Sequence, residues 1–498
     1  LPHLKWLADP GYIDGNHVYY VDLKPRIFDA RIYEGATDFA HPLHDIWTTQ
    51  MNSSDRTLRA NGWSTVLVGG MRFGGGSITV TGDFDNNSST ADTTRTFTSS
   101  YFAIDITDPL NPILLWERSY NGLGFTTSFP AVLKVEDRVI NAGAPDTVDV
   151  QAQHWFLLFG SGPTAYDGTS SQNSSIFLVD MATGNLARTF TELTDSSGTN
   201  NGTSLPSNGF MGSPVSVDLT VDYSVNVSYI GESHASGGTY DGGLYRLQVP
   251  VTVGTANGKP VLLYDVDPNT WTLTHMFDAD YGITAAPAAS VGTADSNYSL
   301  WLYFGTGRYL THADKADTTQ QYLYGIKDPY YNFKLDAGQQ TALLNAEPLD
   351  KSYLFNTTGV TVYTDGSIAG TAEAATFGEL KLRQGPSLTY EVGWYKELDI
   401  IGERIVSKPS ILGGILLAPS FVPNDDICAF GGDSWLHALY FETGTAYVES
   451  VVGVEADDSV KDKIELGVGI SSSLGIHVGR EHGARGFIQQ STGTINQI

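Results

Sequence analysis

A short unit of strand, glycine turn, second strand and acidic residue recurs along this chain. The apolar run at 154–160 stops at a glycine, and the next strand, 175–180, ends in aspartate. Residues 301–305 and 321–328 repeat this order, and Thr65 begins a third copy. Apolar runs bounded by glycine and acidic turns indicate short buried strands. The recurrence therefore constrains the chain to a repetitive, all-β architecture.

Four short strands per unit, at a spacing of several tens of residues, are typical of a β-propeller, whose blades pack only against their neighbours. We predict an all-β, modified β-propeller of seven irregular blades, one of them shared between segments 1–33 and 486–495. A pair of β-sandwiches is the alternative. The expected domain is a single propeller spanning 1–498, with polar loop insertions near 77–100, 161–174, 194–208 and 232–241. Helical periodicity is confined to 336–344 and 372–375.

The charge of the chain limits its partners. Its 55 acidic and 28 basic residues give a formal charge of -27, which repels nucleic acid and anionic membrane surfaces. No apolar run is long enough to insert in a membrane. The single cysteine, Cys428, excludes a disulfide within the chain. The chain begins with Leu1 and shows no signal pattern, so we expect a targeting signal that was removed or lies upstream.

Oxygen-bearing side chains alternate along the segment 218–226. A calcium loop takes side-chain ligands at positions one, three, five and nine and a main-chain carbonyl at seven. These positions correspond to Asp218, Thr220, Asp222 and Asn226, with Ser224 supplying its carbonyl. Threonine at three, asparagine at nine and no glycine at six depart from the usual loop, and two carboxylates predict weak binding. The alternative is an edge strand whose polar face is solvated.

Other candidate sites are weaker. Asp83, Asp85 and Asn87 match the first three ligand positions of an acidic loop, but a solvated loop is the favoured interpretation. A histidine pair and an aspartate at 41–45 favour a surface turn over a zinc site.

The usual sequence signatures of enzymes are incomplete or missing in this chain. The segment 254–260 imitates a phosphate-binding loop, but it is one residue short and has Pro260 where a hydroxyl belongs. No Gly-x-Ser-x-Gly, His-Glu-x-x-His or Cys-x-x-Cys pattern occurs. Cys428 has acidic neighbours, which disfavour a reactive thiolate. We therefore expect neither a catalytic site nor an organic cofactor.

A series of segments, taken in order, resembles the C-terminal propeller of the PilY family, the type IV pilus tip-associated biogenesis factors and adhesins. They are 65–75, 101–112 with 115–117, 303–310, 324–328, 393–395 with 402–409, and 431–435. The resemblance implies a propeller with a calcium loop in one blade, followed by a strand like Gly-Gly-Leu-Tyr-Arg at 242–246. The loop in register with that strand is the one at 218–226.

The resemblance implies a non-enzymatic protein outside the cell, at the tip of a type IV pilus. Its implied partners are the minor and major pilins and a host or abiotic surface, and its implied role is pilus assembly, retraction control and adhesion, with possible modulation by Ca²⁺. The chain departs from the family in that Cys428 has no partner cysteine and no Arg-Gly-Asp tripeptide occurs. Two alternatives share the fold: a quinoprotein-like dehydrogenase and a glycan-binding lectin.

Overall fold

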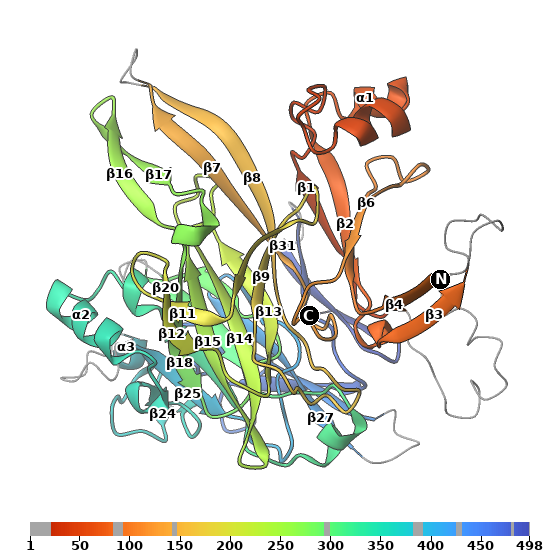
Figure 1. Ribbon diagram of the computed structural model, residues 1–498. Coiled ribbons are helices and arrows are strands. Elements are labelled where there is room, and N and C mark those ends of the chain that lie inside the picture. Colours follow the sequence, from red (N-terminus) through yellow and green to blue (C-terminus); the bar gives the residue numbers. More distant parts are fainter. Residues whose placement is uncertain are drawn as a thin grey trace. The chain divides into compact units, whose positions relative to one another are not determined.

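The computed structural model describes residues 21–82, 93–141, 147–292, 299–381, 392–424, 431–479 and 483–497. The chain forms two compact units. Unit 1 comprises Leu1–Val227 and Gln248–Leu273, and unit 2 comprises Ser228–Leu247 and Thr274–Ile498. Strands dominate both units (Figure 1). The all-β class expected from the sequence is confirmed for the described residues.

Unit 1 contains two four-stranded antiparallel sheets. The first has the order β1-β2-β5-β6 and the second the order β10-β9-β8-β7. The strands of the first sheet are β1 (Arg26–Ala30), β2 (Ser64–Gly70), β5 (Tyr101–Asp105) and β6 (Ile113–Arg118). Those of the second are β7 (Ala131–Ile140), β8 (Val148–Gly160), β9 (Ile176–Asp180) and β10 (Leu186–Phe190). Strands β7 and β8 are long, and the hairpin of β16 (Val251–Ala256) and β17 (Lys259–Tyr264) lies beside β7 (Figure 1).

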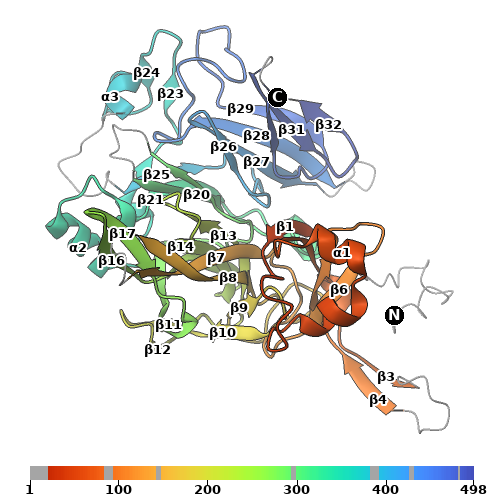
Figure 2. The same ribbon diagram turned by 90° about the horizontal axis from the view of Figure 1, so that it is seen from above.

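The polar insertions of unit 1 are partly ordered as hairpins. One is formed by β3 (Ile78–Gly82) and β4 (Thr93–Phe97), which project from the first sheet (Figure 2). A second is formed by β11 (Glu192–Thr194) and β12 (Asn200–Ser204). The remaining elements are α1 (Ser53–Leu58), β13 (Gly209–Val217), a π-helical turn at Ile46–Gln50, and 3-10 turns at Phe73–Gly75 and Pro268–Thr270.

Four further sheets, of three to five strands, complete the fold, and most of their residues belong to unit 2. Their orders are β13-β14-β15-β18, β19-β20-β21-β25-β22, β26-β27-β28-β29 and β30-β31-β32. Besides β13, the strands of the first two are β14 (Val227–Ser236), β15 (Thr239–Gln248), β18 (Thr272–Ala279), β19 (Ala288–Val291), β20 (Leu300–Gly305), β21 (Tyr322–Lys327), β22 (Phe355–Asn356) and β25 (Gly393–Glu397). Those of the last two are β26 (Ser410–Leu412), β27 (Ile415–Pro423), β28 (Gly432–Tyr440), β29 (Lys463–Val468), β30 (Gly475–Gly479), β31 (Gly483–Gln489) and β32 (Ile495–Gln497).

The helices of unit 2 are short. The expected helix near 336–344 is α2 (Ala337–Ala346), which begins at a capping box between Asp336 and Gln339. The prediction of a second helix at 372–375 is wrong, because α3 lies later in the chain, at Phe377–Lys381. The other elements are the hairpin β23 (Thr361–Val362) with β24 (Ile368–Ala369) and 3-10 turns at His312–Ala316, Pro329–Tyr331 and Lys351–Tyr353.

The number of blades differs from the prediction. Sheets of three or more strands number six among the described residues, not seven. The seventh blade was expected to join the two ends of the chain. Instead, β1 belongs to the first sheet of unit 1, and β31 pairs with β30 and β32 in the last sheet of unit 2. The segment 232–241, expected as an insertion, consists of the end of β14, a two-glycine turn and the start of β15.

The recurring aspartates turn the chain at strand ends. Asp180 accepts hydrogen bonds from the amide and hydroxyl of Thr183 at 2.9 and 2.7 Å, and Asp105 makes the same pair of contacts with Thr107. Each carboxylate satisfies an amide that has left the sheet ladder. Beneath these turns, unit 1 buries an apolar cluster in which the Trp116 indole donates to a main-chain carbonyl of the neighbouring sheet at 2.8 Å.

Candidate functional site

The loop that follows β13 brings the five expected ligand residues together. The Asp218 carboxylate accepts hydrogen bonds from the main-chain amides of Asp222 at 3.2 Å and Tyr223 at 2.7 Å. Farther along, the Asn226 Oδ1 atom accepts one from the Leu219 amide at 2.7 Å. The first and ninth positions of the expected calcium loop therefore fold the segment back on itself.

The other three positions are also engaged. Asp222 Oδ1 accepts from the Ser224 amide at 3.2 Å and from the Tyr264 hydroxyl at 2.9 Å. The hydroxyl of Thr220 lies 3.2 Å from that of Tyr264. The Ser224 hydroxyl is buried and accepts a hydrogen bond from the Glu136 amide. A tyrosine of β17 and the backbone of β7 thus complete the surroundings of the loop.

The loop turns tightly without glycine. Val221 and Tyr223 have φ angles of 54° and 70°, in the left-handed region that non-glycine residues seldom adopt. Tyr223 holds the sixth position, where a calcium loop ordinarily has glycine. Both side chains are largely exposed. The missing glycine, a departure from the usual loop, does not prevent the turn.

Arg138 places a guanidinium against this loop. Its Nη1 donates to Asp222 Oδ2 at 2.7 Å, and its Nη2 donates to the Asp222 carbonyl at 2.5 Å. Nε and Nη2 also donate to Glu136 Oε2 at 2.9 and 2.6 Å. The guanidinium carbon lies 5.4 Å from the centre of the Tyr264 ring. The fifth ligand position is therefore bound to a cation of the protein itself.

Sequence reasoning missed Arg138, although β7 carries a signal. Lys134, Glu136 and Arg138 alternate along the strand, which places them on one face. The pairing of β7 with β8 shifts between Asp137 and Arg138, and such a bulge redirects the side chain next to it. The alternation of Lys134, Glu136 and Arg138 along the strand indicates an ionic contact on one face, but it does not identify the partner on the loop.

The ionic contacts around the loop set the charge states of its neighbours. Burial tends to raise the pKa of Glu136, but hydrogen bonds from Lys134 and Arg138 outweigh it and lower the pKa below its usual value. Burial raises the pKa of Tyr264 to about 12, so its hydroxyl stays protonated at neutral pH. With Asp218 and Asp222, the cluster contains three carboxylates and two basic groups.

The donor atoms are of the kind that calcium prefers, since all five candidate residues offer oxygen. Their arrangement does not yet form a calcium site, because Arg138 occupies both Asp222 Oδ2 and the Asp222 carbonyl. Within the described part of the chain, no cluster of three or more histidine, cysteine or acidic side chains is arranged to hold a metal ion. A cation from solution would have to compete with the guanidinium.

The remaining sequence candidates have different outcomes. Asp83, Asp85, Asn87 and Cys428 lie outside the described residues. His41 Nδ1 accepts a hydrogen bond from the Leu43 amide at 3.1 Å within a turn. A turn is the interpretation of 41–45 that the sequence favoured over a zinc site. The phosphate-loop imitation is the β16–β17 hairpin, whose turn is formed by residues 257–258 with positive φ angles.

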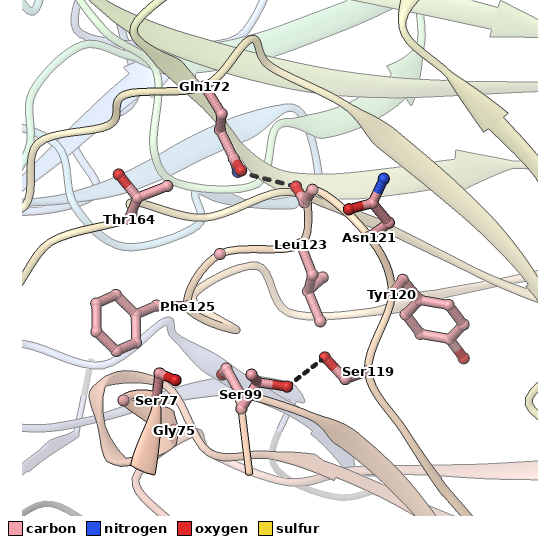
Figure 3. Close-up of a pocket in the computed structure, with 14 residues that line it drawn as sticks. Gly75, Ser77, Ser99, Ser119, Tyr120, Asn121, Leu123, Phe125, Thr164 and Gln172 are labelled. Carbon is pink, nitrogen blue, oxygen red and sulfur yellow. Dashed lines mark hydrogen bonds between the residues drawn. The ribbon is translucent and has the colours of Figure 1, made fainter. Parts of the chain in front are cut away.

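A second candidate surface in unit 1 is a pocket of 480 Å³ (Figure 3). It is lined by residues 75–77, 98–99 and 119–125, with Thr164 and Gln172. Gln172 Nε2 donates to the Gly122 carbonyl at 2.8 Å and fixes the rim of the pocket. The lining contains hydroxyl, amide and aromatic groups and no charged side chain. In a chain with a charge of -27, this neutral surface suits an uncharged polar ligand.

A larger hollow of 600 Å³ lies in unit 2 and is lined by charged residues. Its three lysines, however, are already paired. Lys396 contacts Asp462 at 2.8 Å, Lys461 contacts Glu455 at 3.1 Å, and Lys463 contacts Asp399. The hollow therefore offers a ligand little uncompensated positive charge.

Unit 2 also contains a serine, a histidine and a glutamate in contact. Ser420 Oγ and His437 Nε2 both bond Glu403 Oε1, at 2.5 and 2.7 Å. A nucleophilic triad instead requires the serine to bond the histidine. All three side chains are buried. Burial opposes ionisation of Glu403, but the bonds from His437 and Ser420 lower its pKa to about 2. The cluster has the geometry of a buried structural hydrogen-bond group.

Comparison with known proteins defines the class and then the family. The structure is similar to the crystal structure of the C-terminal domain of Pseudomonas aeruginosa PilY1, with a TM-score of 0.57 and 19% identity, over 98% of this chain and 87% of that one. This match supports the propeller class over paired sandwiches. The family model of the PilY1 beta-propeller domain matches residues 54–342. The chain therefore belongs to the PilY1 β-propeller family.

Curated relatives agree with this assignment. Type IV pilus biogenesis factor PilY1 of Pseudomonas aeruginosa PAO1 is 25% identical over 458 residues, which cover 89% of this chain and 32% of the relative. A PilY1 homologue of Xylella fastidiosa is 25% identical over 471 residues, covering 91% of this chain and 24% of the relative. The chain thus spans a third or less of the length of these two relatives.

Proposed function

We propose that this chain is the propeller portion of a type IV pilus biogenesis factor that acts outside the cell, at the pilus tip. The observation that carries the proposal is the family match over residues 54–342, supported by relatives named as pilus biogenesis factors. Among the described residues, no helix is both long and apolar enough to span a bilayer. The proposed partners are the minor and major pilins and the surface to which the cell attaches.

The structure supports a scaffold that presents loops. Sheets of three to five strands form the rigid part of the fold, and the hairpins β3–β4, β11–β12 and β16–β17 extend from unit 1 as separate two-stranded ribbons. Binding residues in such proteins commonly lie on loops that a rigid scaffold positions. We infer that the pilins and the attachment surface are contacted through these projections.

Deletion of the gene in its own organism tests the proposal. We expect loss of surface pili and of pilus-dependent attachment, and recovery of both when the full-length gene is restored. Restoration with a copy lacking residues 54–342 should leave the cells without pili. Normal piliation with that truncated copy would contradict a role for this domain.

A role without catalysis is part of the proposal. The Ser420–Glu403–His437 contact is buried and has the wrong order of bonds for a nucleophile. The rival class is a quinone-dependent dehydrogenase, because such enzymes are also propellers. Purified protein with added pyrroloquinoline quinone should reduce no dye in the presence of alcohols or sugars, and turnover would favour the enzyme.

Glycan binding is a second candidate, favoured by the 480 Å³ pocket. Neutral sugars are recognised by hydroxyl and amide groups and by aromatic surfaces, and the pocket supplies these without charge. Asn121 lies on its wall (Figure 3). We expect an array of neutral glycans to show binding that Asn121→Ala weakens. The same glycan-binding profile for the wild-type protein and Asn121→Ala would exclude this pocket as the glycan-binding site.

Modulation by calcium completes the proposal. The loop at 218–226 offers oxygen ligands, and two carboxylates predict a site that fills only at high calcium concentration. We expect a higher melting temperature in millimolar calcium than in chelator, because a ligand that binds the folded state stabilises it. Asp222→Ala should abolish the difference. Identical melting curves of the wild-type protein in both buffers would remove calcium from the proposal.

A further inference from the structure

The 218–226 loop is closed by hydrogen bonds among its own groups. The amides of Asp222 and Tyr223 donate to Asp218, and the Ser224 amide donates to Asp222. These bonds gather two carboxylates in one turn. The negative charges of Asp218 and Asp222 repel each other within this turn. The closed loop therefore requires a compensating positive charge.

Arg138 supplies that charge with four hydrogen bonds. It spans Asp222 on the loop and Glu136 on its own strand, and all the joining distances are between 2.5 and 2.9 Å. A planar guanidinium that bonds two oxygens of one residue fixes geometry as well as charge. Its side chain is only 11% exposed, so water screens these contacts little.

The lysine on the same strand cannot replace it. Lys134 Nζ contacts Glu136 Oε1 at 2.5 Å, whereas its contact with the loop is with the Tyr223 ring, 5.6 Å from the centre. A guanidinium is not deprotonated in proteins. Arg138 is therefore a permanent cation at the fifth ligand position.

We propose that Arg138 is the resident cation of the 218–226 loop and that calcium binds there only by displacing it from Asp222. The first part stands on the contacts alone, and the second rests on the calcium part of the proposed function. The two parts predict opposite effects of one substitution. Arg138→Gln loosens the loop without metal and, by freeing Asp222, improves its affinity for calcium.

The first measurement is amide hydrogen exchange of the purified chain in chelator. Arg138→Gln should speed exchange at the amides of Asp222, Tyr223 and Ser224 by about tenfold or more, the effect of about 1.4 kcal/mol in local opening. Arg31→Gln is the matched control, because it removes a guanidinium that binds Glu34 elsewhere on unit 1. Unchanged exchange in the Arg138→Gln loop would overturn the assignment of Arg138 as resident cation.

The second measurement is calcium titration by calorimetry. Arg138→Gln should bind calcium at least about tenfold more tightly than wild type. The calcium affinity of Arg138→Lys should lie between the two, because lysine keeps the positive charge but loses the paired donors of the guanidinium. Equal or weaker binding by Arg138→Gln would refute displacement. If no protein in the series binds calcium, the calcium proposal and the displacement both fail, and exchange in chelator still decides whether Arg138 holds the loop.

Discussion

Removal of the Arg246 side chain should strongly destabilise unit 2. Arg246 Nη1 donates to Asp328 Oδ1 at 2.7 Å and to Glu347 Oε1 at 2.9 Å, and Nη2 donates to Glu347 Oε2 at 2.9 Å. The Tyr229 hydroxyl donates to the other oxygen of Asp328 at 2.5 Å. The three ionic side chains are at most 4% exposed. One buried guanidinium thus compensates two buried carboxylates.

The expected cost follows from what the substitution leaves behind. Arg246→Met keeps much of the side-chain volume but leaves the buried Asp328 carboxylate without its ionic partner. Removing one partner of a buried ion pair costs about 3–5 kcal/mol. With a urea dependence of about 3 kcal/mol/M for a unit of this size, the unfolding midpoint should fall by about 1–2 M.

The control substitution is Lys461→Met, which also removes one positive charge. Lys461 and Glu455 are 37% and 58% exposed, and an exposed pair of this kind contributes about 0–1 kcal/mol. Urea unfolding followed by tryptophan fluorescence should therefore separate the two variants clearly. A midpoint for Arg246→Met that matches that of Lys461→Met would refute the view that this network holds unit 2 together.

Three further predictions concern unit 2. Burial raises the pKa of Glu347 from 4.5 to about 7 despite Arg246. The folded state therefore favours the protonated acid, and the free energy of unfolding falls as pH rises from 4.5 to 7. Glu347→Gln should reduce this pH dependence of the free energy of unfolding, measured by urea titrations. Glu403, with a pKa of about 2, gives the opposite pH dependence. Its contribution to the free energy of unfolding is full above pH 4.5 and is lost as pH falls toward 2. Glu403→Gln should therefore lower the free energy of unfolding most at neutral pH and little near pH 2. The Trp394 indole donates to the Phe441 carbonyl at 2.9 Å in a fully buried position, and Trp394→Phe should lower the free energy of unfolding by about 2 kcal/mol or more. A loss within about 0.5 kcal/mol, as at a surface site, would show that the indole contact is dispensable.

The elements that local chemistry determines could be predicted from the sequence. Asp180 ends β9 because its side chain bonds the amide three residues on, and that bond depends only on neighbours in the chain. The helix at Ala337–Ala346 follows from Asp336 and Gln339 for the same reason. The alternating oxygens of the 218–226 loop predict calcium ligand positions from local spacing alone, and that assignment stays a prediction.

Features that depend on distant or competing contacts were not predictable. Arg138 and Asp222 are 84 residues apart, and no local pattern pairs them. The helix expected at 372–375 starts instead at Phe377, because Thr376 and Glu379 exchange hydrogen bonds that fix the first turn there. The prediction of seven blades was wrong for a similar reason. The sheet in which a terminal strand pairs depends on its distant partner strands, and the sequence of the terminal segment does not identify them.

The central claim, association with a type IV pilus, is tested most directly by the composition of sheared pili. Pili should be sheared from cells that produce the full-length protein, purified by sedimentation and analysed by quantitative mass spectrometry. The account predicts peptides of this chain in the pilus fraction together with pilins, and their disappearance from the same fraction of cells that lack the major pilin. An equal amount of this chain in both fractions, or its presence in the cell body alone, would contradict the account.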